Sequence, residues 1–416
     1  MSLNAPCFIG KVNAKKTIHI IGGGFSGLCL GFFFKKNSIP FIIHEKESKP
    51  GGKIDSLQTS AGNGETGAHA FYVSDSMIKD LRPLNLEILR AQPKLKKKVY
   101  RDRRFASPPI KFREALILAW NFFTKRPPRF HEEMSLAEFL APLGTSAVNR
   151  ELFGAVMVGV YGADSQQLHL ASLFKQVDFN TVTTYLSFLK QIKASKNKER
   201  YTSISFPAGM GSLIKAFQDE LRDHIQLGDD IKQLPENCII CTDAHAAAEL
   251  ISASSLVKAN ALNKISYLPV TPVTIITSEN LEQLKDSFGC LFSPQVYNGK
   301  IRGILNNWAI FPKQRKEKGL NSYTFIMATS HKPEQTLEDE LQSLGLSHIF
   351  QNRKGLLKHS WEKALPLYDS NRYRSIMKLK NEPWQELGIF GNYIGGISLR
   401  EIFLSAKDLA QGLKNE

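Results

Sequence analysis

The sequence predicts an α/β fold with more than one domain, and three observations support this prediction. The chain has 416 residues, a length that suggests two or three domains and a core large enough to enclose a big ligand. Residues 17–45 follow the order strand, glycine-rich turn, helix and strand, which is typical of a dinucleotide-binding βαβ unit. Beyond residue 205, strand-like segments alternate with helical ones. We therefore expect a Rossmann-type domain joined to a mixed-sheet domain and a helical subdomain.

Apolar runs, and the glycines and polar turns that end them, locate the individual elements. The first unit should have strands at 17–21 and 41–45, with a helix between them that ends near Lys36. A hairpin with its turn at 61–64 follows, and helical, apolar-rich sequence continues to about Leu173. The later elements are expected as strands around 231 and at 238–242, 270–277, 301–308, 323–328 and 387–390, and as helices at 212–221, 244–250, 335–344 and 399–412.

Composition excludes several classes of protein. Apolar residues make up 42% of the chain, which is ordinary for a globular protein and excludes disorder, collagen-like repeats and coiled coil. No apolar run approaches the roughly 18–20 residues of a membrane-spanning helix. The first residues lack the pattern of a signal peptide, so we expect a cytoplasmic protein. The five cysteines do not make a disulfide framework, and we interpret Cys238 and Cys241 as buried strand residues rather than as a redox or zinc site.

The net charge of +15 is concentrated in one segment. Between Arg90 and Phe130 there are 13 Lys and Arg residues and two acidic residues, together with aromatic residues that include Trp120 and Phe123. Basic residues beside exposed aromatic ones suit attachment to the anionic inner face of a membrane. A solvated basic face above a packed helix explains the same pattern equally well. No nucleic-acid-binding module accompanies the charge, so we expect no nucleic-acid partner.

The glycine-rich turn after the first strand fits the fingerprint of a phosphate-binding loop. Gly22, Gly24 and Gly27 have the spacing G-x-G-x-x-G, with Phe25 and Ser26 inside it. The first glycine allows a tight turn, the second lets the backbone reach a pyrophosphate, and the third lets the helix pack on the strand. The N-terminus of the helix offers unpaired N–H groups to phosphate oxygens. We therefore predict a dinucleotide site, the alternative being an ordinary βαβ unit without a nucleotide.

The type of dinucleotide follows from what surrounds this fingerprint. Glu45 ends the second strand, 23 residues beyond Gly22. A carboxylate at this position accepts hydrogen bonds from ribose hydroxyls and would repel a 2′-phosphate, which disfavours NADP. The fingerprint occurs once in the chain. A single site is more consistent with a flavin reoxidised by oxygen, a quinone or another diffusible acceptor than with separate sites for FAD and NAD(P)H.

The segment 45–53 resembles a motif of a known enzyme superfamily. It is similar to E-A-x-x-R-x-G-G-[RK], which follows the Rossmann unit in FAD-dependent amine-oxidase-like enzymes. That superfamily includes amine oxidases, phytoene desaturases and protoporphyrinogen oxidases. The resemblance implies that FAD is the cofactor, with its adenosine ribose at Glu45 and its pyrophosphate beside the glycine pair. It assigns to the cofactor site Glu45, Lys46, Lys49, Gly51, Gly52 and Lys53.

Later segments resemble the same superfamily in the expected order. Residues 65–69 resemble the segment E-x-G-[AP] that runs beside the isoalloxazine, and residues 206–210 resemble the return into the FAD domain. Residues 391–398 resemble G-N-Y-x-G-G-[VI]-[SAG], where a helix N-terminus points at the flavin pyrimidine and can stabilise negative charge. An apolar residue at 231 matches a position whose backbone faces the adenine. The resemblance thereby adds to the site Gly67, Ala68, His69, Ile231, Gly391, Asn392, Gly396, Ile397 and Ser398.

The motif at 391–398 narrows the resemblance to protoporphyrinogen and coproporphyrinogen oxidases, because amine oxidases typically have G-E-[YH] there. Segments 265–270, 303–312 and 361–368 are similar to the same enzymes. Departures from the family pattern occur at Lys49, Asn371, Arg372 and Ala406. The resemblance implies discontinuous domains: an FAD-binding domain at 1–78, 206–262 and 386–416, a helical, basic subdomain at 79–170, and a substrate domain at 171–205 and 263–385.

The resemblance also implies where the chemistry takes place. The flavin carries the reaction, so no catalytic side chain and no metal are predicted. The implied substrate is a porphyrinogen-like small molecule, whose propionates call for a cation at the cavity mouth. Candidates for substrate contact are Lys98, Arg101, Arg104, Trp361 and Tyr368. Two other functions stay open: another FAD-dependent enzyme that acts on amines or polyenes, and a non-enzymatic flavoprotein. No feature of the sequence indicates an oligomeric state.

Overall fold

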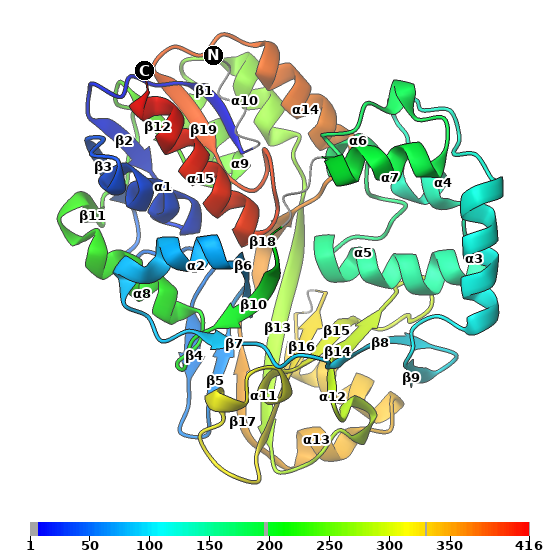
Figure 1. The fold of residues 1–416 in the computed structure, drawn as a ribbon. Coiled ribbons are helices and arrows are strands. Elements are labelled where there is room, and N and C mark those ends of the chain that lie inside the picture. Colours follow the sequence, from blue (N-terminus) through cyan, green and yellow to red (C-terminus); the bar gives the residue numbers. More distant parts are fainter. Residues whose placement is uncertain (1–6, 195–198, 329–330, 416) are drawn as a thin grey trace.

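The computed structural model describes residues 7–194, 199–328 and 331–415. Within these residues the nucleotide-binding domain is built on a six-stranded sheet with the strand order β1-β19-β12-β2-β3-β11 (Figure 1). The strands are parallel except for β1, which is antiparallel to β19. Their bounds are β1 (Phe8–Lys11), β2 (Ile18–Ile21), β3 (Phe41–Glu45), β11 (Ile225–Leu227), β12 (Cys238–Ile240) and β19 (Leu387–Phe390). The sheet thus joins three parts of the chain that lie far apart in sequence.

Helices cover both faces of this sheet. On one face, Ile18 and Ile20 of β2 share a core with α1 (Phe25–Lys36), α8 (Gly211–Glu220) and α15 (Leu399–Lys414). On the other face, Ile21 and Ile240 share a core with α9 (Ala244–Ile251), α10 (Leu256–Asn263) and α14 (Ser370–Asn381). A strand that is buried on both faces reads as a continuous apolar run, which is why β2, β3, β12 and β19 could be found from the sequence, whereas β1 was not predicted.

A second, mixed sheet of eight strands forms the other half of the described chain, with the order β17-β13-β16-β15-β14-β8-β9 and β18 paired to β13. Its long strand β13 rises through the middle of the molecule (Figure 1), and α12 and α13 close one face through a shared apolar core. The bounds are β8 (Lys96–Arg101), β9 (Arg104–Ala106), β13 (Tyr267–Thr277), β14 (Ser287–Phe292), β15 (Ile301–Asn306), β16 (Asn321–Met327), β17 (Arg353–Lys358), β18 (Trp361–Pro366), α12 (Pro333–Ser343) and α13 (Ser347–Gln351).

A group of helices with its own apolar core lies beside the two sheets, at the right of Figure 1. It comprises α3 (Phe112–Thr124), α4 (Leu136–Leu140), α5 (Gly154–Tyr161), α6 (Leu170–Leu173) and α7 (Tyr185–Ala194). The smaller elements are β4 (Ser56–Gln58), β5 (Asn63–Glu65), β6 (Phe71–Ser74), β7 (Leu89–Arg90), β10 (Tyr201–Ser205), α2 (Asp75–Leu81) and α11 (Asn307–Ile310). The predicted fold class is confirmed, whereas the domain limits given above stay a proposal.

Three expected elements differ from the structure. The strand expected around Ile231 is wrong, because β11 ends at Leu227, where Gly228 turns the chain with φ +70°. The strand expected at 301–308 stops at Asn306, and the apolar residues that follow form the short helix α11. The segment 79–170 is not wholly helical, since β8 pairs with β14 in the mixed sheet. Its run of lysines hides the alternation by which a strand is recognised.

Candidate functional site

A large cavity lies between the nucleotide-binding domain and the mixed sheet. Its volume is about 1530 Å³, and its walls come from β2, β3, the 51–69 segment, α5, β13, β15 and the N-terminus of α15. Pockets for drug-sized ligands measure about 300–1,000 Å³. The cavity is therefore large enough for a dinucleotide together with a second ligand.

The glycine-rich turn forms one end of this cavity. Gly22 leaves β2 with φ +107°, and α1 begins at Phe25. A Cβ added to Gly27 would lie 2.0 Å from the carbonyl oxygen of Gly22, so only glycine lets the helix approach the strand this closely. By contrast, a Cβ added to Gly24 would meet its nearest neighbour among the described residues, Gly52 Cα, at 3.9 Å. The cavity is therefore open next to Gly24. We call this open space the glycine floor of the cavity; it is the space that a pyrophosphate needs to reach the backbone.

The second glycine pair lies against the first turn. Gly51 donates its N–H to the carbonyl oxygen of Gly23 at 2.9 Å, and Gly51 and Gly52 both have positive φ. Glu45 is buried at the end of β3, where its Oε2 accepts the N–H of Gly23 at 2.7 Å and its Oε1 accepts the N–H of Glu47 at 3.0 Å. A carboxylate oxygen has more than one lone pair. Glu45 can therefore accept ribose hydroxyls while it holds the loop in place.

The N-terminus of α15 faces the cavity from the other end of the chain. Ser398 caps the helix: its Oγ accepts the N–H of Glu401 at 3.2 Å, and Glu401 accepts the N–H of Ser398 at 3.1 Å. Arg400 follows in the first turn and lines the cavity. The positive end of a helix dipole and an arginine together favour a ligand that carries or develops negative charge.

Two buried cations hold the turn that precedes α15. Arg372 donates from Nε to the carbonyl oxygen of Tyr393 and from Nη2 to that of Ile394, both at 2.7 Å. Lys175 donates to the carbonyl oxygens of Ile394 and Gly395, and burial lowers the pKa of Lys175 to about 7. Because Lys175 follows α6 and Arg372 lies on α14, these bonds tie the turn both to the helical group and to a helix that covers the six-stranded sheet.

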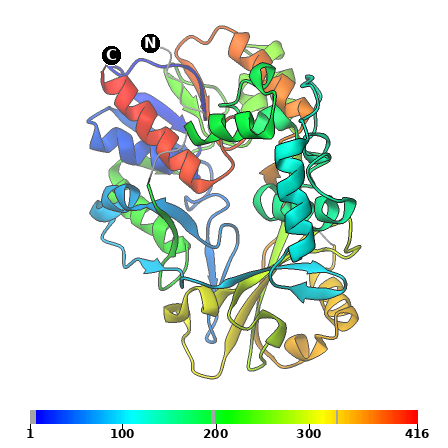
Figure 2. The ribbon, with the colours of Figure 1, turned by 45° about the vertical axis from the view of Figure 1, so that its right-hand side comes forward.

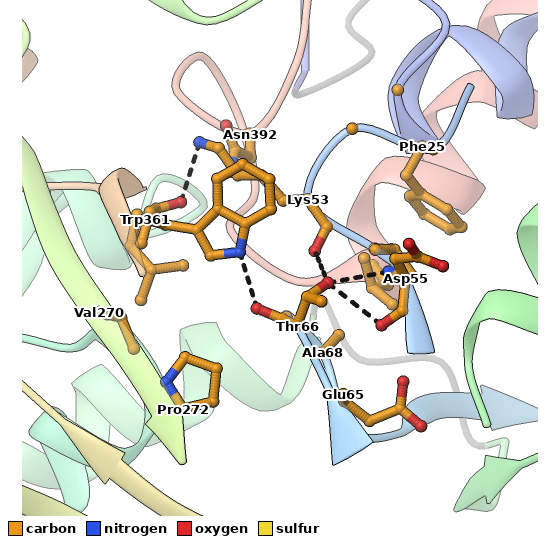
Figure 3. Close-up of a pocket in the computed structure, with 18 of the residues that line it drawn as sticks. Phe25, Lys53, Asp55, Glu65, Thr66, Ala68, Val270, Pro272, Trp361 and Asn392 are labelled. Carbon is orange, nitrogen blue, oxygen red and sulfur yellow. Dashed lines mark hydrogen bonds between the residues drawn. The ribbon is translucent and has the colours of Figure 1, made fainter. Parts of the chain in front are cut away.

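The wall between the two ends of the cavity is centred on Thr66 (Figure 3). Thr66 Oγ1 accepts the N–H of Asp55 at 3.0 Å, and the Trp361 indole donates from Nε1 to the carbonyl oxygen of Thr66 at 2.7 Å. Lys53 donates from Nζ to the carbonyl oxygen of Ala364 at 3.0 Å, and burial lowers the pKa of Lys53 to about 8. These bonds cross from the nucleotide-binding domain to the mixed sheet and fix the indole in the cavity wall.

The residues present fit FAD. The open floor at Gly24, the carboxylate of Glu45 and the positive end of α15 match, respectively, a pyrophosphate, a ribose and a ring that gains negative charge on reduction. His69 also lines the cavity, and its buried Nε2 has no hydrogen-bond partner among the described residues. Burial lowers the pKa of His69 to about 4, so the ring is neutral near pH 7 and available to a ligand.

Glu65, which also lines the cavity, should make the stability of the protein depend on pH. Its Oε2 accepts from Ser56 Oγ at 2.6 Å and its Oε1 accepts the N–H of Met210 at 3.0 Å, yet burial raises the pKa of Glu65 from 4.5 to about 8. Between these pH values the folded protein keeps a proton that the unfolded chain releases, so the free energy of unfolding should fall as pH rises. Glu65→Gln should flatten this fall and be more stable than the unmodified protein at pH 8.

Urea unfolding at several pH values measures this effect, with the exposed Glu317→Gln as the matched control. Parallel curves for Glu65→Gln and the unmodified protein would contradict the assignment of a buried, protonated carboxyl.

Most of the residues predicted for the cofactor line the cavity. They are Gly22, Gly24, Phe25, Ser26, Glu45, Lys46, Lys49, Gly51, Gly52, Lys53, Gly67, Ala68, His69, Ile231, Gly391, Asn392, Ile397 and Ser398. Gly27 and Gly396 do not line it. Gly27 serves the packing of α1, and Gly396 donates its N–H to Cys7 Sγ at 3.1 Å.

Fewer of the candidates for substrate contact line the cavity. Trp361 lines the cavity, whereas the four other candidates do not. Tyr368 lies behind the turn at 391–396 and donates to the carbonyl oxygen of Asn392 at 2.6 Å. Arg101 is buried in ion pairs with two glutamates, Lys98 donates to a backbone carbonyl, and Arg104 is exposed on β9.

Sequence reasoning missed Arg302, which lines the mixed-sheet side of the cavity. It lies on β15 within the apolar run Ile301–Asn306. A charged residue inside an otherwise apolar strand was the available signal, since such a residue needs a partner or a ligand.

Comparisons with known proteins agree with this site. A family model described as an NAD(P)-binding Rossmann-like domain matches residues 20–81. The mitochondrial protoporphyrinogen oxidase of Nicotiana tabacum is 25% identical over 482 aligned residues, which cover 96% of this chain and 95% of the relative. The coproporphyrinogen III oxidase of Staphylococcus aureus is 25% identical over 246 residues, 52% of each chain.

The solved structures extend the comparison to the whole fold. Cyclohexylamine oxidase from Brevibacterium oxydans matches with a TM-score of 0.66 at 13% identity, covering 97% of this chain and 99% of that one. The match thus spans nearly the whole length of both chains. This chain is thus similar in sequence to protoporphyrinogen oxidases and in fold to an amine oxidase, and it is an FAD-dependent oxidoreductase.

Proposed function

We propose that the protein oxidises a porphyrinogen to a porphyrin, with oxygen or a quinone as the final electron acceptor. The observation that carries this proposal is the cavity itself, which runs from the glycine floor into an apolar chamber. The chamber is lined by Leu268, Val270, Pro272, Phe288, Leu291, Ile326 and Met327. A chamber of this kind suits a bulky, mainly apolar ring system. The match to a protoporphyrinogen oxidase over 95% of its length supports the same substrate class.

The protein's part in this reaction is to position the substrate and exclude water. FAD, when bound, supplies the acceptor for a hydride from a substrate carbon. The Trp361 indole, fixed by its bond to Thr66, offers a rigid apolar wall to a flat substrate (Figure 3). The positive end of α15 stabilises negative charge that develops near it. Arg372 and Lys175 keep the turn before α15 in place through its carbonyl oxygens.

Turnover of the two reduced tetrapyrroles tests the proposal. FAD-loaded protein is mixed with anaerobically prepared protoporphyrinogen or coproporphyrinogen, air is admitted, and porphyrin fluorescence is followed. We expect one of the two to become porphyrin faster than in a protein-free control. If neither does, the porphyrinogen assignment fails, and amines and polyenes become the substrates to screen.

We further propose that the protein attaches to an anionic membrane surface through α3. Four side chains at spacings of three and four residues, and hence on one face of the helix, are strongly exposed: Phe112 by 80%, Leu116 by 55%, Trp120 by 70% and Phe123 by 75%. The helix stands at the edge of the molecule, away from the nucleotide-binding domain (Figures 1 and 2). Its ends carry the basic residues Lys111, Arg113, Lys125, Arg126 and Arg129.

This arrangement suits a helix that lies on a membrane rather than across one. An apolar face with basic residues at both ends is typical of interfacial helices that bind anionic lipid. Within the part of the chain that the structure describes, no helix has the length and apolar character needed to span a bilayer. Any attachment through α3 would therefore be peripheral.

Vesicle sedimentation at low salt checks this attachment. We expect the protein to bind phosphatidylglycerol vesicles, and Trp120→Ser combined with Phe123→Ser to weaken binding by at least about 10-fold, because two large apolar side chains lose their burial in lipid. Leu256→Ser, on a residue that is 70% exposed on α10, is the matched control. Equal sedimentation of the double variant and the control, or no binding by the unmodified protein, would exclude this role of α3.

A further inference from the structure

The charge of Arg302 has no carboxylate partner. Its Nη1 donates to the carbonyl oxygen of Gly299 at 2.7 Å and to that of Ile301 at 3.3 Å. Among the described residues, Nε and Nη2 have no hydrogen-bond partner, and no carboxylate lies within ion-pair distance of the guanidinium. The nearest acidic group in its surroundings, Glu340, already accepts from the hydroxyl of Tyr297 and from two backbone N–H groups.

Every other cation on the cavity wall is already engaged. Three of the lysines pair with neighbouring carboxylates, the pairs being Lys46 with Glu47, Lys49 with Asp55, and Lys232 with Asp230. Lys53 donates to a backbone carbonyl. Arg400 lies over the rings of Tyr72 and Tyr201. Lys53 also lies over the ring of Tyr267. Among the described cations of the wall, Arg302 is thus the one that has neither a carboxylate partner nor an aromatic ring against its charge.

Arg302 lies on the side of β15 that lines the cavity. On β15, Ile301 and Ile304 enter the core under α12 and α13, whereas Arg302, Gly303 and Leu305 line the cavity. The pairing of β15 with β16 shifts register between Ile301 and Gly303. This irregularity lets two consecutive residues, Arg302 and Gly303, both line the cavity. Arg302 is partly buried, and burial lowers the pKa of its guanidinium without removing its charge.

We infer that Arg302 binds a carboxylate of the substrate, so that the cavity selects molecules with an apolar body and an acidic side arm. Nε and Nη2 lie on the same edge of a guanidinium, and this edge pairs with a carboxylate through two parallel hydrogen bonds. The inference rests on the proposed function only for the identity of the apolar part of the substrate, to which it adds a carboxylate. Porphyrinogens, which carry propionates, are members of this class.

Paired acid and ester ligands test the inference on the FAD-loaded protein. The probes are coproporphyrin and its tetramethyl ester, and pyrenebutyrate and its methyl ester, with binding followed by fluorescence. Arg302→Met should lower the ratio of acid affinity to ester affinity by about 10- to 100-fold, because a charge-assisted pair in an apolar wall is lost. Arg104→Met, on an exposed arginine outside the cavity, should leave the ratio unchanged. Flavin content reports whether each variant is folded, and Arg302→Gln replaces Arg302→Met if that variant does not fold.

The two ligand pairs separate the inference from the proposed function. An unchanged acid-to-ester ratio in the neutral Arg302 variants overturns the inference, even if porphyrinogens are turned over. The same holds if the unmodified protein does not prefer pyrenebutyrate to its ester. If the ratio for pyrenebutyrate falls as expected but no porphyrinogen is oxidised, the proposed function fails and the carboxylate site stands.

Discussion

Gly24→Ala is expected to remove FAD from the protein while leaving its fold intact. The backbone of Gly24 has φ −69° and ψ 180°, which any residue adopts, and the added methyl group would meet no described atom beyond its chain neighbours closer than 3.9 Å. The methyl group would instead occupy the floor where the pyrophosphate must approach the backbone. We expect the Kd for FAD to rise by about 100-fold, close to 3 kcal/mol, with the stability of the FAD-free protein within about 0.5 kcal/mol of the unmodified protein.

Gly27→Ala is the matched control for this prediction. Its methyl group would lie 2.0 Å from the carbonyl oxygen of Gly22, so helix and strand must move apart at a cost of about 1–3 kcal/mol or more. This variant should therefore lose stability even without FAD. Flavin absorbance after gel filtration, combined with urea unfolding of the FAD-free proteins, distinguishes the two. If Gly24→Ala kept its FAD, the cofactor would not lie on this floor.

Arg101→Met is expected to destabilise the protein by about 3 kcal/mol, because removing one partner of a buried ion pair leaves the remaining charge uncompensated. Arg101 is 2% exposed, and its Nη2 lies 2.6 Å from Glu114 Oε1 and 2.7 Å from Glu151 Oε2. These pairs join β8 to α3 and to the segment before α5. Urea unfolding measures the loss, with Arg104→Met as a control that should change stability by less than about 0.5 kcal/mol.

The same variant decides between the structural role of Arg101 and the substrate role that the sequence suggests. Since Arg101 does not line the cavity, FAD content and porphyrin affinity per folded molecule should stay unchanged. Loss of porphyrin affinity at full stability would instead restore Arg101 to the substrate site.

The elements that could be predicted are those whose pattern is local. The first βαβ unit was located because its strands are apolar on both faces and its glycines have a fixed spacing. The strand at 387–390 is likewise apolar, and the helix after Ser398 follows a glycine-rich turn, so both could be predicted from local sequence. By contrast, β8 consists of Lys96–Arg101, and only its pairing with β14 makes it a strand. Such pairing depends on residues about 190 positions away and leaves no trace in the local sequence.

The site divides in the same way. The residues at the glycine-rich end of the cavity could be predicted because a dinucleotide imposes glycines and a carboxylate at definite spacings. The substrate end has no such motif, since it is assembled from α5, β13, β15 and the 361–365 segment, whose order in the chain carries no spacing rule. The basic segment 90–130 suggested Arg101 as a substrate contact, but the fold uses Arg101 for ion pairs. Arg302 was overlooked because its neighbours in sequence are mostly apolar.

Anaerobic reduction of the bound flavin distinguishes a porphyrinogen substrate from an amine or a polyene. FAD-loaded protein is mixed without oxygen with coproporphyrinogen, protoporphyrinogen, a set of primary and secondary amines, or a polyene, and the visible flavin absorption is followed. We expect one of the porphyrinogens to bleach the flavin by a two-electron transfer and to give porphyrin only after air is admitted, because the later oxidation steps need a reoxidised flavin. The amines and the polyene should leave the flavin oxidised. Bleaching by an amine or the polyene, with both porphyrinogens inert, would contradict this expectation.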